Sequence, residues 1–187
     1  MLNESYDAIR VCDFGSALYE DESIITSELV SRYYRAPEII LGIKPNTKID
    51  IWSLGCTLYE IYTGKILFSG RNNSEMIKMF IEVNGRFGNK ILKKGEYTPL
   101  YFTEDFNYFK WIDINESKAQ NVIVKNIDVN TMKRKDIKTL IAESSLKKKE
   151  NDKEVKQFIN LIENCLTIDP YKRISAIDAY THPFLWK

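Results

Sequence analysis

The side chains that could carry chemistry lie in a few short charged motifs. Asp13 opens the tripeptide Asp13-Phe14-Gly15, and Arg32 and Arg35 flank two tyrosines. Carboxylates bind cations or accept hydrogen bonds, whereas guanidinium groups only donate them. Taken singly, each motif has a plain explanation: a turn aspartate after a strand, and a solvated basic pair. The order of the motifs along the chain is more informative than any one of them.

Four motifs follow one another in a fixed order. They are Asp13-Phe14-Gly15, Arg35-Ala36-Pro37-Glu38, Asp50-Ile51-Trp52-Ser53-Leu54-Gly55 and Asp169-Pro170-Tyr171-Lys172-Arg173-Ile174. This order and spacing resemble the C-terminal half of a eukaryotic protein kinase domain. The resemblance implies an α+β, protein-kinase-like fold, of which residues 1–187 form the mainly helical C-terminal lobe without the N-terminal lobe.

The same resemblance assigns roles to the residues of the first motif. Asp13 would bind Mg²⁺ beside the phosphates of ATP, and Phe14 would pack inward and orient Asp13. Gly15 lets the backbone turn tightly. Cys12 would face the nucleotide pocket, and a buried, unreactive thiol is the expectation for it. ATP and Mg²⁺ are therefore the cofactors expected of the complete kinase.

Other matched residues have architectural roles in this family. Glu38 and Arg173 would form a buried ion pair that ties the substrate-side segment to the last helices. Asp50 would accept N–H bonds from the start of its own helix or from the neighbouring catalytic loop. Trp52 is expected in the core.

The segment Ser31-Arg32-Tyr33-Tyr34-Arg35 narrows the resemblance to the CMGC group of kinases. In that group the two arginines bind a phosphorylated residue of the activation segment, here 13–38, a use of charge-assisted hydrogen bonds. A long insert, here about 84–152, is also typical of the group.

Within the CMGC group the chain is most similar to the pre-mRNA-processing factor four kinases, which are spliceosome-associated. The stretch Gly55-Cys56-Thr57-Leu58-Tyr59-Glu60-Ile61-Tyr62-Thr63-Gly64-Lys65 carries much of this similarity. The resemblance implies protein substrates that are splicing factors, phosphorylation at Ser or Thr, and a nuclear location. Relatives have an activating tyrosine where this chain has Glu28. We hypothesise that the Glu28 carboxylate replaces part of a phosphate's charge beside Arg32 and Arg35. The alternative is an exposed glutamate, with control of the segment moved to Thr26, to Ser27 or to no residue.

No Gly-rich phosphate loop, strand lysine or His-Arg-Asp catalytic loop is recognisable in the chain. We therefore expect no catalytic residue here, with the base and the remaining N-terminal region encoded upstream of Met1, and no phosphotransfer by residues 1–187 alone. The alternative function is a truncated, non-catalytic kinase lobe that acts as a protein-binding module.

Composition limits the other function classes. The 187 residues are 44% hydrophobic and 28% charged, with a net charge of +1, so no overall field favours nucleic acid. The sequence contains no run of 18 apolar residues, so it predicts no membrane-spanning helix. The cysteines, Cys12, Cys56 and Cys165, lie far apart, as expected for free thiols in a reducing, intracellular compartment.

Periodicity and turn residues predict the elements that position these side chains. Apolar spacing around Trp52 predicts a buried core helix, and Gly64 its end. The chain is expected to form a short strand over 8–12, a loop over 16–31, a short helix over 38–41, the core helix over 50–63, a helix over 73–83, an irregular insert over 84–152, and the final helices within 153–187.

Overall fold

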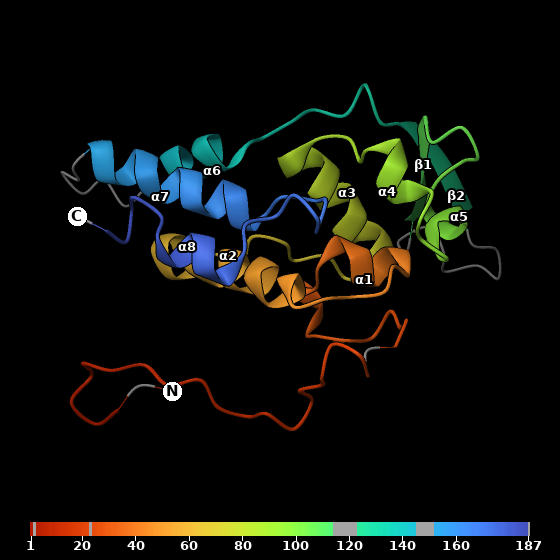
Figure 1. Cartoon of the computed structure of the whole chain (residues 1–187). Coiled ribbons are helices and arrows are strands. Elements are labelled where there is room, and N and C mark those ends of the chain that lie inside the picture. Colours follow the sequence, from red (N-terminus) through yellow and green to blue (C-terminus); the bar gives the residue numbers. More distant parts are fainter. Residues whose placement is uncertain (2, 23, 114–122, 145–151, 187) are drawn as a thin grey trace.

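The computed structural model describes residues 1, 3–22, 24–113, 123–144 and 152–186. These residues form a helical body with one small sheet, and the N-terminal segment runs outside it (Figure 1). None of the described helices is both long and apolar enough to cross a membrane. The elements are η1 (Arg32–Tyr34), α1 (Pro37–Leu41), α2 (Lys48–Thr63), α3 (Asn73–Asn84), α4 (Asn89–Leu92), α5 (Thr98–Tyr101), β1 (Tyr108–Asp113), β2 (Ile123–Asp128), α6 (Ile137–Glu143), α7 (Asp152–Cys165) and α8 (Ala176–Tyr180).

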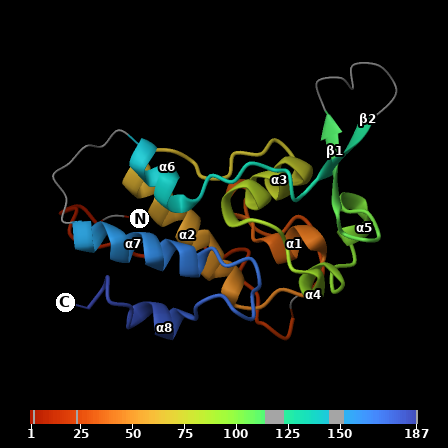
Figure 2. The ribbon, with the colours of Figure 1, turned by 90° about the horizontal axis from the view of Figure 1, so that it is seen from above.

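The helix expected over 50–63 is α2, which packs obliquely against α7 (Figure 2). Trp52 is fully buried, and its ring stacks on Phe68 and meets Phe80 edge-on at centroid distances of 5.6 and 5.1 Å. Gly64 ends the helix with φ +70°, a left-handed conformation that glycine adopts at little cost. This aromatic cluster fixes α2 relative to α3, the helix that carries Phe80.

A close backbone approach supports the end of α1. The amide of Tyr97 donates to the carbonyl of Leu41 over 2.9 Å, and a side chain on Gly42 would collide with the Tyr97 ring. Gly42 also has φ +70°. Only glycine suits both demands, so the turn that follows α1 is closely specified.

The region 84–152, expected to be irregular, contains regular elements in its described part. Strands β1 and β2 form an antiparallel hairpin in which Tyr108 pairs with Asp128. Phe109 is fully buried and belongs to the same apolar cluster as Phe80, so this strand contributes to the main core. Alternation along β1 explains the strand, since Phe109 points to the core while Tyr108 is exposed. Residues 114–122 and 145–151 of this region lie outside the described chain.

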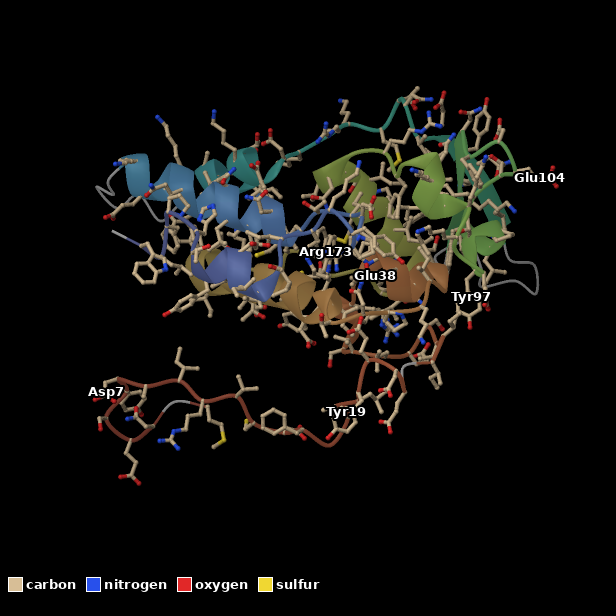
Figure 3. The ribbon with its side chains drawn as sticks, viewed as in Figure 1. Asp7, Tyr19, Glu38, Tyr97, Glu104 and Arg173 are labelled. Atoms are coloured by element: carbon tan, nitrogen blue, oxygen red, sulfur yellow. The ribbon has the colours of Figure 1, made fainter. Side chains whose placement is uncertain are left out.

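The strand expected over 8–12 does not form in the described segment. Met1 and Arg10 are joined by a backbone bond of 2.9 Å, but no neighbouring strand continues the pairing. Asp7 and Tyr19 mark this segment in Figure 3, where it lies away from the helices. An apolar alternation gives a stable strand only when a partner strand and a packing surface are present.

Candidate functional site

A buried ion pair joins an early segment of the chain, at α1, to a late segment that follows α7. Arg173 donates to both carboxylate oxygens of Glu38, at 2.7 and 2.8 Å, and both side chains are almost fully buried at 0% and 1% exposure. Figure 3 shows the two residues meeting inside the body. The fork geometry satisfies both oxygens at once, which is the arrangement that a buried carboxylate requires.

The remaining donors of Arg173 are also occupied. Its Nε donates to the carbonyl of Thr167 over 2.9 Å, and Nη1 donates to the carbonyl of Lys48 over 2.8 Å. Its guanidinium lies 5.1 Å from the Trp52 ring centre, within cation–π range. Arg173 therefore ties α1, the start of α2 and the segment after α7 into one unit.

Asp50 lies in the first turn of α2. Helix α2 begins at Lys48, so Asp50 is the third residue of the helix and its side chain is exposed. Its carboxylate accepts no hydrogen bond from the described residues, so the bonds expected from the start of its own helix do not form, while bonds from a catalytic loop stay a prediction. It retains only a favourable position near the positive end of the helix dipole.

Arg35 organises the segment before α1 from a buried position. Its Nε and Nη2 donate to the carbonyl of Val30 at 3.1 and 3.0 Å, and Nη1 donates to Oδ1 of Asn73 at 3.1 Å. Val30 has φ +66°, a strained conformation for a β-branched residue. The pKa of Arg35 is lowered overall, mainly by burial, and the nearby Glu28 carboxylate opposes part of this shift. The arginine thus stabilises an unusual turn and links it to α3.

Glu28 and Arg32 occupy different surroundings. Oε2 of Glu28 lies 3.7 Å from Nη2 of Arg35, and the Glu28 side chain is 77% exposed. Arg32 points elsewhere, since its Nη1 donates to the carbonyl of Arg71 over 2.6 Å. The structure therefore brings Glu28 to Arg35 but not to Arg32.

Arg35 bonds to the first residue of α3, whereas Arg32 bonds to the segment just before that helix. Asn72 caps this helix by accepting from the amide of Glu75 over 2.8 Å. Glu75 in turn accepts from the Arg71 amide over 2.7 Å and from the Arg71 guanidinium. The hydrogen bond from Arg71 is the main cause that lowers the pKa of Glu75. The contact between Asn73 and Arg35 was not foreseen from the sequence, which predicted only a helix over 73–83.

The residues expected beside a nucleotide are open to solvent in this structure. Phe14 is 68% exposed and Cys12 is also exposed, which corrects the expectations of an inward-packed ring and a buried thiol. Asp13 has φ +64° and Gly15 follows it, so the tight turn is present. Residues 3–22 run outside the helices, and the described body does not cover this segment.

The residues around Asp13 can be compared with what a Mg²⁺–ATP site requires. A single carboxylate is a reasonable partial ligand for Mg²⁺, which often takes one or two protein oxygens together with phosphate. Yet no three His, Cys, Asp or Glu side chains of the described residues gather where they could hold a metal. The described residues alone therefore do not fit a complete Mg²⁺–ATP site.

The described chain consists of a well-packed scaffold and an exposed N-terminal segment. Arg35 and the Glu38–Arg173 pair hold residues 29–38 on α2 and α3, whereas Asp13 lies on the part of the chain that the scaffold does not enclose. Such an arrangement can present a loop to a protein substrate, because a rigid scaffold commonly positions functional loops.

Comparison with known proteins gives the same assignment as the motifs. The protein kinase domain family matches residues 1–185. The chain is 42% identical to the serine/threonine-protein kinase prpf4B of Dictyostelium discoideum over 99% of its length, and 38% identical to the serine/threonine-protein kinase prp4 of Schizosaccharomyces pombe over 100%. It is 32% identical to homeodomain-interacting protein kinase 2 of Mus musculus over 95% of its length.

The chain spans only part of each relative, namely 23%, 39% and 16% of these three proteins. Kinases of this family generally use ATP and Mg²⁺. With the family match over residues 1–185 and the ordered motifs now placed in the structure, the chain belongs to the protein kinase domain family.

Proposed function

We propose that the protein containing this chain is a serine/threonine kinase that transfers the γ-phosphate of ATP to protein substrates. The names of the two relatives at 42% and 38% identity support Ser and Thr as acceptors. Similarity to the pre-mRNA-processing factor four kinases supports splicing factors as substrates and the nucleus as the location. Residues 1–187 would be the C-terminal lobe of the kinase domain.

The observation that carries this proposal is the anchored segment 29–38. Arg35 fixes its first part through Val30 and Asn73, and the buried Glu38–Arg173 pair fixes its end. Phosphoryl transfer depends mainly on positioning and charge neutralisation, so a fixed substrate-side segment is a real contribution to the reaction. Asp13 would be the Mg²⁺ ligand of this chain, and Cys12 and Phe14 would lie beside ATP. The nucleotide clamp and the catalytic base would be supplied by residues outside 1–187.

A direct test replaces the proposed metal ligand in the full-length protein. With radiolabelled ATP, Mg²⁺ and a Ser/Arg-rich peptide, Asp13→Asn should reduce phosphate incorporation by about two orders of magnitude or more, since metal-held charge is a large part of catalysis. Glu22→Gln is the matched control, because it removes a carboxylate from the same exposed segment. Wild-type incorporation by Asp13→Asn would overturn the assignment of Asp13.

The exposure of Asp13 and Phe14 favours a second candidate for the isolated chain, a protein-binding module without catalysis. We expect purified residues 1–187 to incorporate no phosphate above background under conditions in which the full-length protein is active. Robust incorporation by the isolated chain would contradict this. If the full-length protein also fails to incorporate phosphate although it folds, the non-catalytic function becomes the better explanation.

A further inference from the structure

A large hollow lies between two groups of elements that the kinase motifs do not account for. It has a volume of about 750 Å³ and is lined by the end of α3, by α4, by the segment leading into α6, and by the end of α7 with the residues that follow it. Figure 2 shows α3 and α4 on one side and α6 and α7 on the other. The volume falls within the range of ligand pockets in proteins, roughly 300–1,000 Å³.

Cations outnumber acidic residues around this hollow. The lining contains five basic residues and three acidic ones. The basic residues are Arg86, Lys90, Lys94, Arg134 and Lys172. All five are exposed, so they can reach a ligand without unfolding the body.

Two of the acidic residues are already engaged with the backbone. Asp136 caps α6 by accepting from the amide of Thr139 at 2.8 Å, and Asp169 accepts from the amide of Tyr171 at 3.0 Å. Burial raises the pKa of the third, Glu163. A hydrogen bond from a backbone amide does not remove the charge of a carboxylate, so the excess of positive charge comes from the five basic residues facing three acidic ones.

Four of the five basic groups lack an anionic partner within the described part of the chain. Arg86 donates only to the amide oxygens of Asn130 and Asn89, at 3.4 and 3.2 Å. Lys94 lies over the Tyr171 ring at 4.1 Å, and Lys90 and Lys172 form no ion pair with a described residue. Arg134 is the exception, since the pKa of Asp136 is lowered mainly by the hydrogen bond from the Thr139 amide and further by the Arg134 charge. The remaining excess of cations around the hollow favours an anion.

Two further features indicate a formed site. Gly85 has φ +86°, and a side chain placed there would meet the Arg134 guanidinium at 3.1 Å, so glycine at this position leaves room for the arginine. Asn84 also lines the hollow, and its Nδ2 is buried without a hydrogen-bond partner among the described residues. Unsatisfied buried donors are uncommon in folded proteins and merit a specific explanation.

The lining chemistry limits the ligand class. Phosphate monoesters carry nearly two negative charges and three acceptor oxygens, which suits converging Arg and Lys side chains. The hollow is much larger than a phosphate, and it is also lined by apolar residues such as Ile91, Ile137 and Leu166. A free phosphate would leave these apolar groups uncovered, whereas the flanking residues of a peptide would cover them.

We propose that this hollow binds a protein segment containing phosphoserine or phosphothreonine. The site is separate from Asp13 and does not depend on catalysis by this chain. It would let the protein hold a phosphorylated partner while another residue of that partner is free to approach the exposed segment.

The test measures fluorescence anisotropy with the full-length protein and a labelled pool of ten-residue peptides carrying one fixed phosphoserine. The phosphorylated pool should bind, and the unphosphorylated pool should bind at least about tenfold more weakly, a difference of 1.4 kcal/mol. Replacing Lys90, Arg134 and Lys172 together by Gln should weaken binding by a similar factor or more. Lys65→Gln, a change at an exposed lysine outside the lining, should leave binding unchanged.

Other outcomes would overturn the proposal. These are equal binding of the two peptide pools, full affinity of the triple variant, complete displacement by equimolar inorganic phosphate, or tighter binding of a single-stranded RNA through the same side chains. Thermal melting of each variant shows whether the fold is intact. Asp13→Asn should still bind the peptide, so a failure of the kinase proposal and a failure of this one can be told apart.

Discussion

Two glutamate–arginine pairs begin ten residues apart in the same segment and differ in almost every physical respect. Glu38 and Arg173 are buried and joined by two short hydrogen bonds, whereas Glu28 is 77% exposed and lies 3.7 Å from Arg35. A third pair, Arg71–Glu75, is intermediate, with side-chain exposures of 53% and 11%. The three pairs contain the same residue types, so differences in their contribution to stability reflect their exposure to solvent.

The difference teaches where charge matters for this fold. Water screens an exposed pair, and most of its attraction is lost to the entropy of two long side chains. In a buried pair, removing one partner leaves an uncompensated charge in a poorly polarisable medium. The loss of stability on substitution should therefore be largest for Glu38, smaller for the buried Arg35, smaller again for Glu75, and smallest for Glu28.

The largest effect is expected for Glu38→Gln. Loss of one partner of a buried ion pair costs about 3–5 kcal/mol, because the Arg173 charge remains buried without its counter-ion. Urea denaturation monitored by tryptophan fluorescence measures the free energy of unfolding, and Glu22→Gln is the exposed control. A loss below about 1 kcal/mol, typical of an exposed pair, would remove the contrast between the two pairs.

The next effect is expected for Arg35→Met. This change removes hydrogen bonds to the carbonyls of Leu29 and Val30 and to Asn73, with an expected loss of roughly 1.5–3 kcal/mol for bonds from a charged donor. Hydrogen exchange at residues 29–31 should accelerate, because the strained turn at Val30 loses its support. Arg35→Lys keeps the charge but not the fork. Protection equal to wild type in Arg35→Lys would show that charge alone holds the turn.

The sequence indicated some of these contrasts and missed others for identifiable reasons. Apolar spacing placed Trp52 in the core, and the resemblance to protein kinases implied the pairing of Glu38 with Arg173 across 135 positions. The bond between Arg35 and Asn73 could not be read in this way, because it depends on how α3 docks against the segment before α1. The exposure of Phe14 was missed for a related reason: an aromatic residue is buried only where another surface meets it.

The regular structure within 84–152 was also missed. Its aromatic residues were interpreted as an irregular insert, yet Phe109 alternates with Tyr108 in a strand that packs on α3. Short strands with few residues per side give a weak periodic signal, and burial against a distant helix decides their conformation. Tertiary packing therefore determined the elements that local pattern left open.

A smaller and pH-dependent effect is expected for Glu75→Gln. Arg71 lowers the pKa of Glu75 in the folded state below its ordinary value of 4.5. The ionised carboxylate therefore stabilises the fold above that value, and the contribution is lost as the pH falls through the lowered folded pKa. We expect a loss of about 1–2 kcal/mol at neutral pH. The difference from wild type should shrink in acid.

Denaturation curves between neutral and acidic pH test this dependence, with Glu104→Gln as the exposed control that Figure 3 places at the far edge of the body. A difference that stays constant with pH would mean that Glu75 contributes through packing and not through its charge.

The smallest effect on stability is expected for Glu28→Gln, at most about 1 kcal/mol, because its partner Arg35 keeps other hydrogen bonds and water screens the pair. Added salt should remove most of that difference. If Glu28 replaces part of a phosphate's charge in the full-length kinase, phosphate incorporation should fall and hydrogen exchange at residues 28–31 should rise, although global stability hardly changes. Unchanged incorporation together with unchanged exchange would leave Glu28 as an ordinary exposed side chain. Glu28 would then have no part in ordering the segment that Arg35 holds.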